Sequence, residues 1–362
     1  MTTKYPFYLK STIILLGIVL LVHILSGLQD IIVPLAFALL LSLLLNPLSD
    51  WFQRKKIPHI LSILLSMFIA LIIIVGIVYF ISLQMTNFAD EWPQLQKKSL
   101  QMFADFQRWA KSSLGLTFQK QQQYINSAID SLKSLVAHSV GTVLDSLSIM
   151  ALLPVYTFLF LYYKKLILNF LFEVFKDKSS EEVHVVLKQT KSAVQNYMGG
   201  LLIEGFIVAV LNSIALLLIG VKYAILLGVL GAILNVLPYI GGILAILFPV
   251  VIATVTKDGI HTQLAIVVAY IIIQFIDNHF LIPVIVSSRV RINALISIVV
   301  VLLGGALWGL SGMFLSIPFT GVIKILFDRI PELQPWGKLL GSEIATDHKP
   351  ERVPKLKKVI SK

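Results

Sequence analysis

The chain has 362 residues, of which 57% are hydrophobic and only 14% are charged, and its mean hydropathy is +0.87. A soluble domain carries roughly 25% charged residues, so this composition argues against a soluble protein and predicts an integral membrane protein. The formal net charge is +11, but the basic residues lie mainly in connecting segments and in the C-terminal tail. That distribution predicts contact with anionic lipid and not with nucleic acid.

Six apolar segments are predicted to cross the membrane as helices, at residues 11–28, 31–49, 60–84, 143–163, 199–220 and 262–283. A crossing helix needs roughly 20 apolar residues. The short turn at Gln29 and Asp30 has no basic residue, whereas Arg54, Lys55 and Lys56 follow the second segment. Because short cytoplasmic loops are enriched in lysine and arginine, we expect the N-terminus and the C-terminus to be cytoplasmic in a multi-pass protein.

One segment resembles a soluble region. Within residues 85–141, apolar side chains recur at helical spacing in two stretches that meet near Gly115, which predicts a small extracytoplasmic helical insert. The whole chain is therefore predicted to have five parts. They are N-terminal spans (1–84), the insert (85–141), a span with a cytoplasmic loop (142–198), a core (199–328) and a basic cytoplasmic tail (329–362).

Two further apolar segments, 223–256 and 292–327, are too long for one crossing and are interrupted near the middle. The first interruption contains Pro238, Gly241 and Gly242; the second contains Gly304, Gly305, Gly309 and Gly312. Irregular backbone at membrane depth persists where protein or a water-filled cavity supplies hydrogen-bond partners. We therefore predict two broken or re-entrant helical hairpins, although the glycines of the second segment also fit simple close packing of helices.

The sequence thus predicts an all-α polytopic membrane protein with about eight membrane segments. The unit of one span followed by one broken hairpin occurs twice, and the predicted topology gives the two copies opposite orientations. Inverted repeats with discontinuous helices are typical of transporters whose binding site lies near the middle of the membrane.

Polar residues at membrane depth are costly and are candidates for a functional site. Gln274, Asp277 and Asn278 have the spacing of one helical face, and Asn235 and Tyr239 flank the first break. Glu204 lies within the span 199–220, where removal from water disfavours a charged carboxyl group and suits proton coupling. The alternatives are a structural glutamate near the interface and a polar clamp between helices.

The sequence has no pattern that predicts catalysis. There is no nucleotide-binding lysine motif and no metal-ligand pairing among the histidines, and the GxSG at Gly309–Gly312 lacks a histidine on a later membrane helix. We therefore expect no enzyme activity, no metal site and no cofactor.

Three motifs between residues 235 and 318 resemble motifs of the AI-2E family of bacterial transporters (autoinducer-2 exporter-like permeases). They are Asn235-x-x-Pro238-Tyr239-x-Gly241-Gly242, Gln274-x-x-Asp277-Asn278 followed by Pro283, and Gly304-Gly305 through Gly312 to Pro318. The resemblance implies eight membrane segments, location in the bacterial inner membrane and a homo-oligomer, such as a pentamer. It also implies export of an autoinducer-2-like solute or, as in other members, sodium/proton exchange.

The leading hypothesis is a secondary transporter or permease that moves a small polar solute and is coupled to an ion gradient. Its partners would be the lipid bilayer, the solute, Na⁺ or H⁺, and further copies of the chain. A sodium(lithium)/proton antiporter is the nearest alternative. A membrane scaffold that acts through the insert and transports nothing is an alternative of another class.

Overall fold

The computed structural model describes residues 6–114, 152–174, 180–235, 240–257, 259–286 and 292–342. Within these ranges the protein is almost entirely helical, and the one β-interaction is an isolated bridge between Ile292 and Gly341. Among the described residues, six helices are long and apolar enough to cross a membrane, or up to seven if a bent pair is counted as one span. The prediction of an all-α polytopic membrane protein is confirmed.

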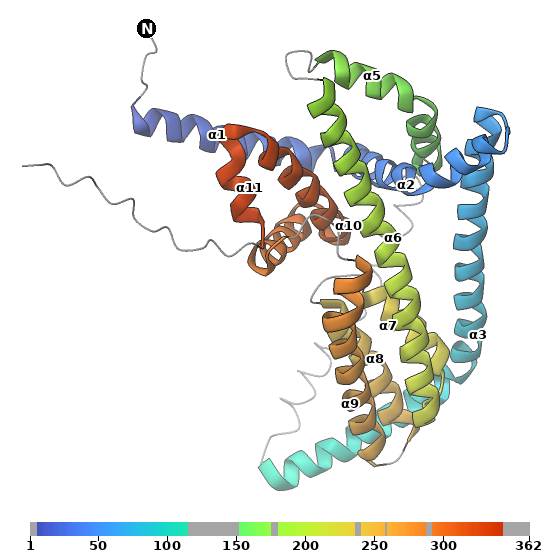
Figure 1. Cartoon of the computed structure of the whole chain (residues 1–362). Helices are drawn as coiled ribbons and strands as arrows, with labels where there is room; N and C mark the ends of the chain where they lie inside the picture. The colour runs from blue at the N-terminus through green and yellow to red at the C-terminus, as the bar shows by residue number, and fades with distance from the viewer. Residues whose placement is uncertain are drawn as a thin grey trace, which may run out of the picture.

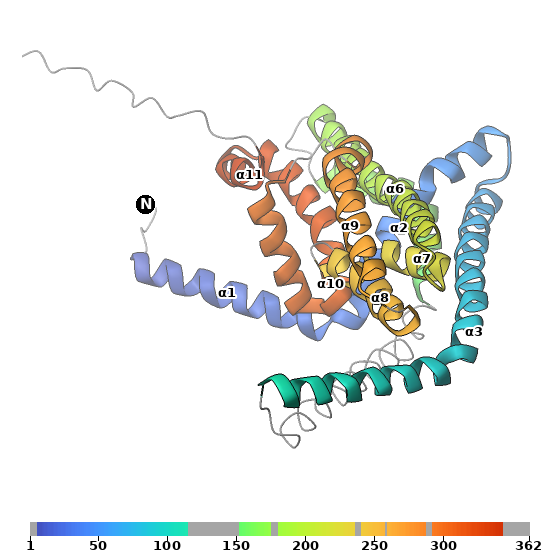
Figure 2. The same ribbon diagram turned by 90° about the horizontal axis from the view of Figure 1, so that it is seen from below.

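The N-terminal part consists of three long helices, α1 (Phe7–Gly27), α2 (Gln29–Arg54) and α3 (His59–Leu114). The first two begin and end close to the predicted spans. The third is longer than the predicted span 60–84, because it continues without interruption through the first half of the predicted insert. Figures 1 and 2 show that α3 turns sharply partway along, so that its last part crosses beneath the other helices. The second half of the insert lies outside the described residues.

The fourth predicted span is described from its middle onward, as a helix at Leu152–Tyr162 that bends by 63° into α5 (Lys164–Val174). Lys164 lies at this bend and contacts the end of α2. Its Nζ donates hydrogen bonds to Asn46 Oδ1 (2.6 Å) and Asp50 Oδ1 (3.3 Å). Two segments predicted to be cytoplasmic from their basic residues are therefore neighbours in the structure.

The sixth helix, α6 (Ser180–Ile219), begins well before the predicted span 199–220. The cytoplasmic loop predicted within residues 142–198 is therefore helical from Ser180 onward, which corrects that part of the prediction. The charged residues that suggested a loop, such as Lys188 and Lys191, lie on the half of α6 that precedes its most apolar part. A helix can extend beyond the apolar region because its backbone hydrogen bonds are made within the segment itself.

The first interrupted segment forms two short helices, α7 (Ala224–Asn235) and α8 (Ile240–Thr256). At about 1.5 Å per residue, the 12 residues of α7 are too short to cross the membrane. Gly241 makes the sharp reversal possible, because a Cβ atom there would overlap the carbonyl oxygen of Leu234. Pro238 and Tyr239, which belong to this break, lie outside the described residues.

The next helix, α9 (His261–Ile276), runs antiparallel to α6 and continues as a π-helix, η1 (Asp277–Val286). Glu204 of α6 is close to Asp277, while Leu216, later in α6, packs in one apolar cluster with Ile266, earlier in α9. This opposite direction is the relation that an inverted repeat requires. Pro283 lies within η1 and has no amide hydrogen to donate to the preceding turn, which accounts for the departure from α-helical bonding.

The second interrupted segment, α10 (Ala294–Arg329), is folded back on itself at Trp308 and Gly309. Gly309 has a φ of 59°, which favours glycine. The indole nitrogen of Trp308 donates a hydrogen bond to the carbonyl of Leu25 in α1 (3.0 Å), so the bend lies near the α1–α2 turn. After α10, the short helices η2 (Pro331–Leu333) and α11 (Gln334–Leu340) return to its start, where Asn293 Nδ2 donates to Leu339 O (2.6 Å).

The two arms of α10 touch at Gly304 and Gly312, and replacement of Gly312 by alanine is expected to separate them. The added Cβ would overlap the carbonyl oxygen of Gly304, which is backbone and cannot rotate away. Overpacking of this kind costs about 1–3 kcal/mol, so the thermal unfolding temperature of the detergent-solubilised protein should fall. Gly17→Ala in α1 is the matched control, because no atom lies within 4 Å of its added Cβ. Equal unfolding temperatures for the two variants would contradict this close packing.

Candidate substrate cavity

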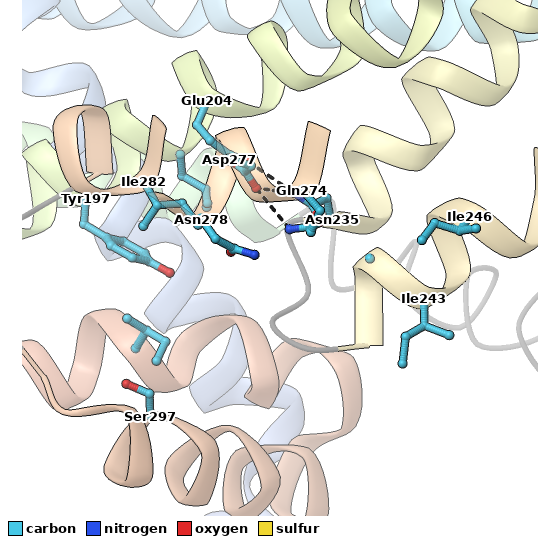
Figure 3. Close-up of a pocket in the computed structure, with 13 residues that line it drawn as sticks. Tyr197, Glu204, Asn235, Ile243, Ile246, Gln274, Asp277, Asn278, Ile282 and Ser297 are labelled. Atoms are coloured by element: carbon cyan, nitrogen blue, oxygen red, sulfur yellow. Dashed lines mark hydrogen bonds between the residues drawn. The ribbon is translucent and has the colours of Figure 1, made fainter. Parts of the chain in front are cut away.

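A cavity of about 680 Å³ lies where α6, the α7–α8 hairpin, the α9–η1 junction and α10 meet (Figure 3). This volume is within the range of small-molecule sites, roughly 300–1,000 Å³. Most of its lining is apolar, with a few polar groups from different helices. The lining residues are Tyr197, Leu201, Glu204, Asn235, Gly242, Ile243, Ile246, Gln274, Asp277, Asn278, Ile282, Ser297 and Ile317.

Helix α6 contributes Tyr197, Leu201 and Glu204, whose spacing of four and then three residues places them on one face. Glu204 is only 4% exposed, although it is predicted from sequence as a residue near the start of a span. Because α6 begins at Ser180, Glu204 lies far from either helix end and is surrounded by other helices. Sequence analysis missed Tyr197, which the helical spacing to Glu204 would have identified had the helix been extended backward.

The α9–η1 junction contributes Gln274, Asp277 and Asn278, and all three line the same cavity, as their spacing predicts. Asp277 is 1% exposed and is the first residue of the π-helix. Gln274 Nε2 donates to Asp277 Oδ2 at 3.4 Å. Short π-helical segments are frequent at functional sites. Here the change from α-helix to π-helix occurs at Asp277, the residue that carries the carboxyl group.

Asn235 is the last residue of α7 and reaches both acidic residues from the tip of the hairpin. Its Nδ2 donates to Asp277 Oδ2 at 3.0 Å and to Glu204 Oε1 at 3.3 Å. Figure 3 shows the amide groups of Asn235 and Gln274 directed at Asp277. The Asn235 amide therefore joins a carboxyl group of α6 to a carboxyl group at the α9–η1 junction. The α7–α8 break positions this amide.

No lysine, arginine or histidine is among the residues described as lining this cavity. Two buried carboxyl groups are thus neighbours, and no cationic side chain among the lining residues compensates their charge. Buried charges are normally paired or neutralised. Such an arrangement can take up a proton, bind a cation through carboxylate and amide oxygens, or accept hydrogen bonds from the hydroxyl groups of a solute.

Three other polar residues of these helices are not among those that line the cavity. His279 stacks on Phe275 and makes a hydrogen bond from its ring to the Phe275 carbonyl (3.0 Å), as expected for a structural residue. Tyr270 of α9 and Asn212 of α6 are buried beside Gly231 of α7. Of the predicted break residues, Gly242 lines the cavity, while Gly304, Gly305, Gly309 and Gly312 lie at or near the bend of α10. Sequence analysis also missed Ser297, in the first turn of α10.

Long apolar helices, two folded-back segments and a mainly apolar cavity with a few convergent polar groups define a polytopic membrane protein of the transporter class. The chain belongs to the AI-2E family of transporters, whose family description matches residues 11–332. This confirms the resemblance found in the Asn235–Gly242, Gln274–Asn278 and Gly304–Pro318 motifs.

Relatives of similar length support the same assignment. The AI-2 transport protein TqsA of Escherichia coli K12 is 24% identical over 323 residues, which cover 88% of this chain and 91% of TqsA. YrrI of Bacillus subtilis 168 is 23% identical over 312 residues (82% and 86%), and YhhT of Escherichia coli K12 is 24% identical over 317 residues (86% and 89%). The last two are described as candidate transport proteins.

Proposed function

We propose that this protein is a secondary transporter that moves a small polar, autoinducer-2-like solute across the bacterial inner membrane and is coupled to an ion gradient. The observation that carries the proposal is the pair of buried carboxyl groups, Glu204 and Asp277, held by Asn235 at the tip of a broken hairpin and open to a cavity of about 680 Å³. Apolar walls with a few convergent polar groups suit a small hydroxylated solute. The acidic pair supplies groups that can exchange a proton.

A sodium(lithium)/proton antiporter is the second candidate, and a specific feature of Asp277 favours it. Its Oδ1 is buried and has no hydrogen-bond partner among the described residues, while its Oδ2 accepts from Asn235 and Gln274. A buried oxygen of this kind is suited to bind a small cation in competition with a proton. The amide oxygens of the same residues could complete an all-oxygen ligand set.

The proposed topology places both termini in the cytoplasm. Lys164, at the start of α5, bonds to Asn46 and Asp50 in the last turns of α2, which supports one cytoplasmic side for both segments. We also place the protein in a homo-oligomer, such as a pentamer. Helix α1 projects from the core with exposed apolar residues along its length (Figures 1 and 2), and neighbouring copies would cover part of that surface.

The test uses purified full-length protein in liposomes that contain a pH-sensitive dye. Autoinducer-2, sodium and lithium are supplied separately as outward or inward gradients, and proton movement is recorded. Solute transport predicts proton movement with autoinducer-2 and none with sodium or lithium alone; antiport predicts the reverse. If none of the three gradients produces proton movement, ion-coupled transport of these substrates is overturned.

A further inference from the structure

The polar residues that line the cavity fall into two groups. The first, which we call the acidic group, consists of four residues that bond to one another: Glu204, Asn235, Gln274 and Asp277. Asn235 Nδ2 donates to both carboxyl groups, and Gln274 Nε2 donates to Asp277. Because these amide donors are directed at the carboxyl groups, the acidic group has little donor capacity left for the hydroxyl groups of a solute.

The second group consists of the three remaining polar lining residues, Tyr197, Asn278 and Ser297. They come from three different helices, α6, η1 and α10. Figure 3 shows Tyr197 and Asn278 on one side of the cavity and Ser297 on the other. Within the part of the chain that the structure describes, neither the Tyr197 hydroxyl nor the Asn278 amide makes a hydrogen bond. Both groups therefore remain available to a molecule in the cavity.

Ser297 is held in a defined orientation by the start of α10. Its Oγ donates a hydrogen bond to the carbonyl of Asn293, the N-cap residue of this helix (3.0 Å). With its own proton used in this way, the Ser297 oxygen can only accept from a ligand, whereas a tyrosine hydroxyl and an asparagine amide can both donate and accept. The three side chains thus offer donors and acceptors from opposite walls, and none of them carries a charge at neutral pH.

Apolar side chains from the same three helices separate these polar groups. Leu201 follows Tyr197 by one turn of α6, Ile282 follows Asn278 by four residues in η1, and Ile317 lies on the returning arm of α10. A few polar groups between apolar walls fix the orientation of a small ligand and provide specificity. The arrangement suits a small molecule that exposes hydroxyl groups on opposite sides of a compact carbon skeleton.

We propose that Tyr197, Asn278 and Ser297 form the part of the cavity that binds a small polyhydroxylated solute, and that the Tyr197 hydroxyl selects for it. The proposal rests on the proposed function, because it names the residues that hold the solute in the same cavity. The acidic group remains free to exchange a proton or a cation while the solute is bound. A solute without hydroxyl groups would leave the three polar groups unpaired among apolar walls, and such sites reject such molecules.

The first test measures binding and does not depend on transport. Autoinducer-2 is titrated into purified full-length protein in detergent, and the dissociation constant is obtained by calorimetry. Tyr197→Phe keeps the ring and removes one hydrogen bond, so the dissociation constant should rise roughly two- to tenfold. Ser297→Ala should raise it in the same way. Tyr79→Phe in α3 is the matched control, because its side chain is exposed and far from the cavity lining.

A structural role for Tyr197 would give a different result. Its hydroxyl bonds to no residue that the structure describes, so the thermal unfolding temperature of ligand-free Tyr197→Phe should equal that of the natural protein. Equal dissociation constants for Tyr197→Phe, Tyr79→Phe and the natural protein would overturn the solute site. The absence of any binding of autoinducer-2 to the natural protein would overturn it as well.

A second test asks whether the solute site is separate from the acidic group. In the Asp277→Asn background, Tyr197→Phe should weaken binding by the same factor as in the natural protein, within about twofold, because substitutions without shared partners are additive. A clearly different factor would mean that both residues hold one ligand together, which would overturn the separation. Loss of all binding in Asp277→Asn alone would do the same.

The outcomes also separate this proposal from the proposed function. Binding that Tyr197→Phe weakens, with no autoinducer-2-driven proton movement in liposomes of the natural protein, would overturn the proposed function while the solute site would stand. Proton movement driven by autoinducer-2 with a half-saturating concentration that Tyr197→Phe leaves unchanged would overturn the solute site alone. A raised half-saturating concentration with an unchanged maximal rate supports both.

Discussion

Asp277→Asn is expected to abolish ion-driven transport while the protein stays folded. Asparagine has nearly the same shape but cannot exchange a proton at neutral pH or offer a carboxylate to a cation. Asp277 lines the cavity, is 1% exposed and accepts hydrogen bonds from Asn235 and Gln274. Loss of a positioned acid–base group typically lowers rates by about 100-fold or more. The measurement is the initial rate of proton movement in dye-loaded liposomes.

Asp30→Asn is the matched control for this variant, because it removes a carboxyl group from an exposed position in the first turn of α2. Its transport rate should equal that of the natural protein. The thermal unfolding temperature of Asp277→Asn should be unchanged or higher, since one of two neighbouring buried carboxyl groups is neutralised. Full ion-driven transport by Asp277→Asn would remove this residue from the coupling mechanism.

Asn235→Leu is expected to reduce both transport and stability. Leucine is similar in size but removes the amide that donates to Glu204 and Asp277, so two buried carboxyl groups lose a shared donor. An unsatisfied buried polar group costs about 1–3 kcal/mol, which should appear as a lower unfolding temperature in detergent. Transport should fall at least as far as in Asp277→Asn, because the hairpin tip would no longer be tied to the acidic pair.

A double-mutant cycle tests whether this loss arises from the carboxyl groups. In the Asp277→Asn background, Asn235→Leu leaves only Glu204 as an acidic partner, so its additional destabilisation should be smaller than in the natural protein. Residues in one hydrogen-bond network are typically coupled by about 0.5–3 kcal/mol. Strict additivity of the two substitutions would mean that Asn235 acts on stability without involving Asp277.

Much of the fold was predictable because the lipid bilayer constrains the sequence strongly. A membrane helix requires a long apolar segment, so α1, α2 and the membrane part of α3 were located within a few residues. Proline and paired glycines likewise marked the α7–α8 reversal, and Gly309 marked the bend of α10. The early start of α6 was missed, because charged residues on a helix beyond the apolar region resemble those of a loop.

The sequence by itself determined that the chain is a helical membrane protein with two broken segments, and it singled out Glu204, Asn235, Gln274, Asp277 and Asn278 as polar residues within apolar helices. Helical spacing could group Gln274, Asp277 and Asn278, since they share one segment. Only the tertiary structure decided that Asn235 joins Glu204 to Asp277, and that Asn212 and Tyr270 meet beside Gly231. These contacts bridge different helices, and the packing of antiparallel helices and hairpins, which no local spacing encodes, sets their distances.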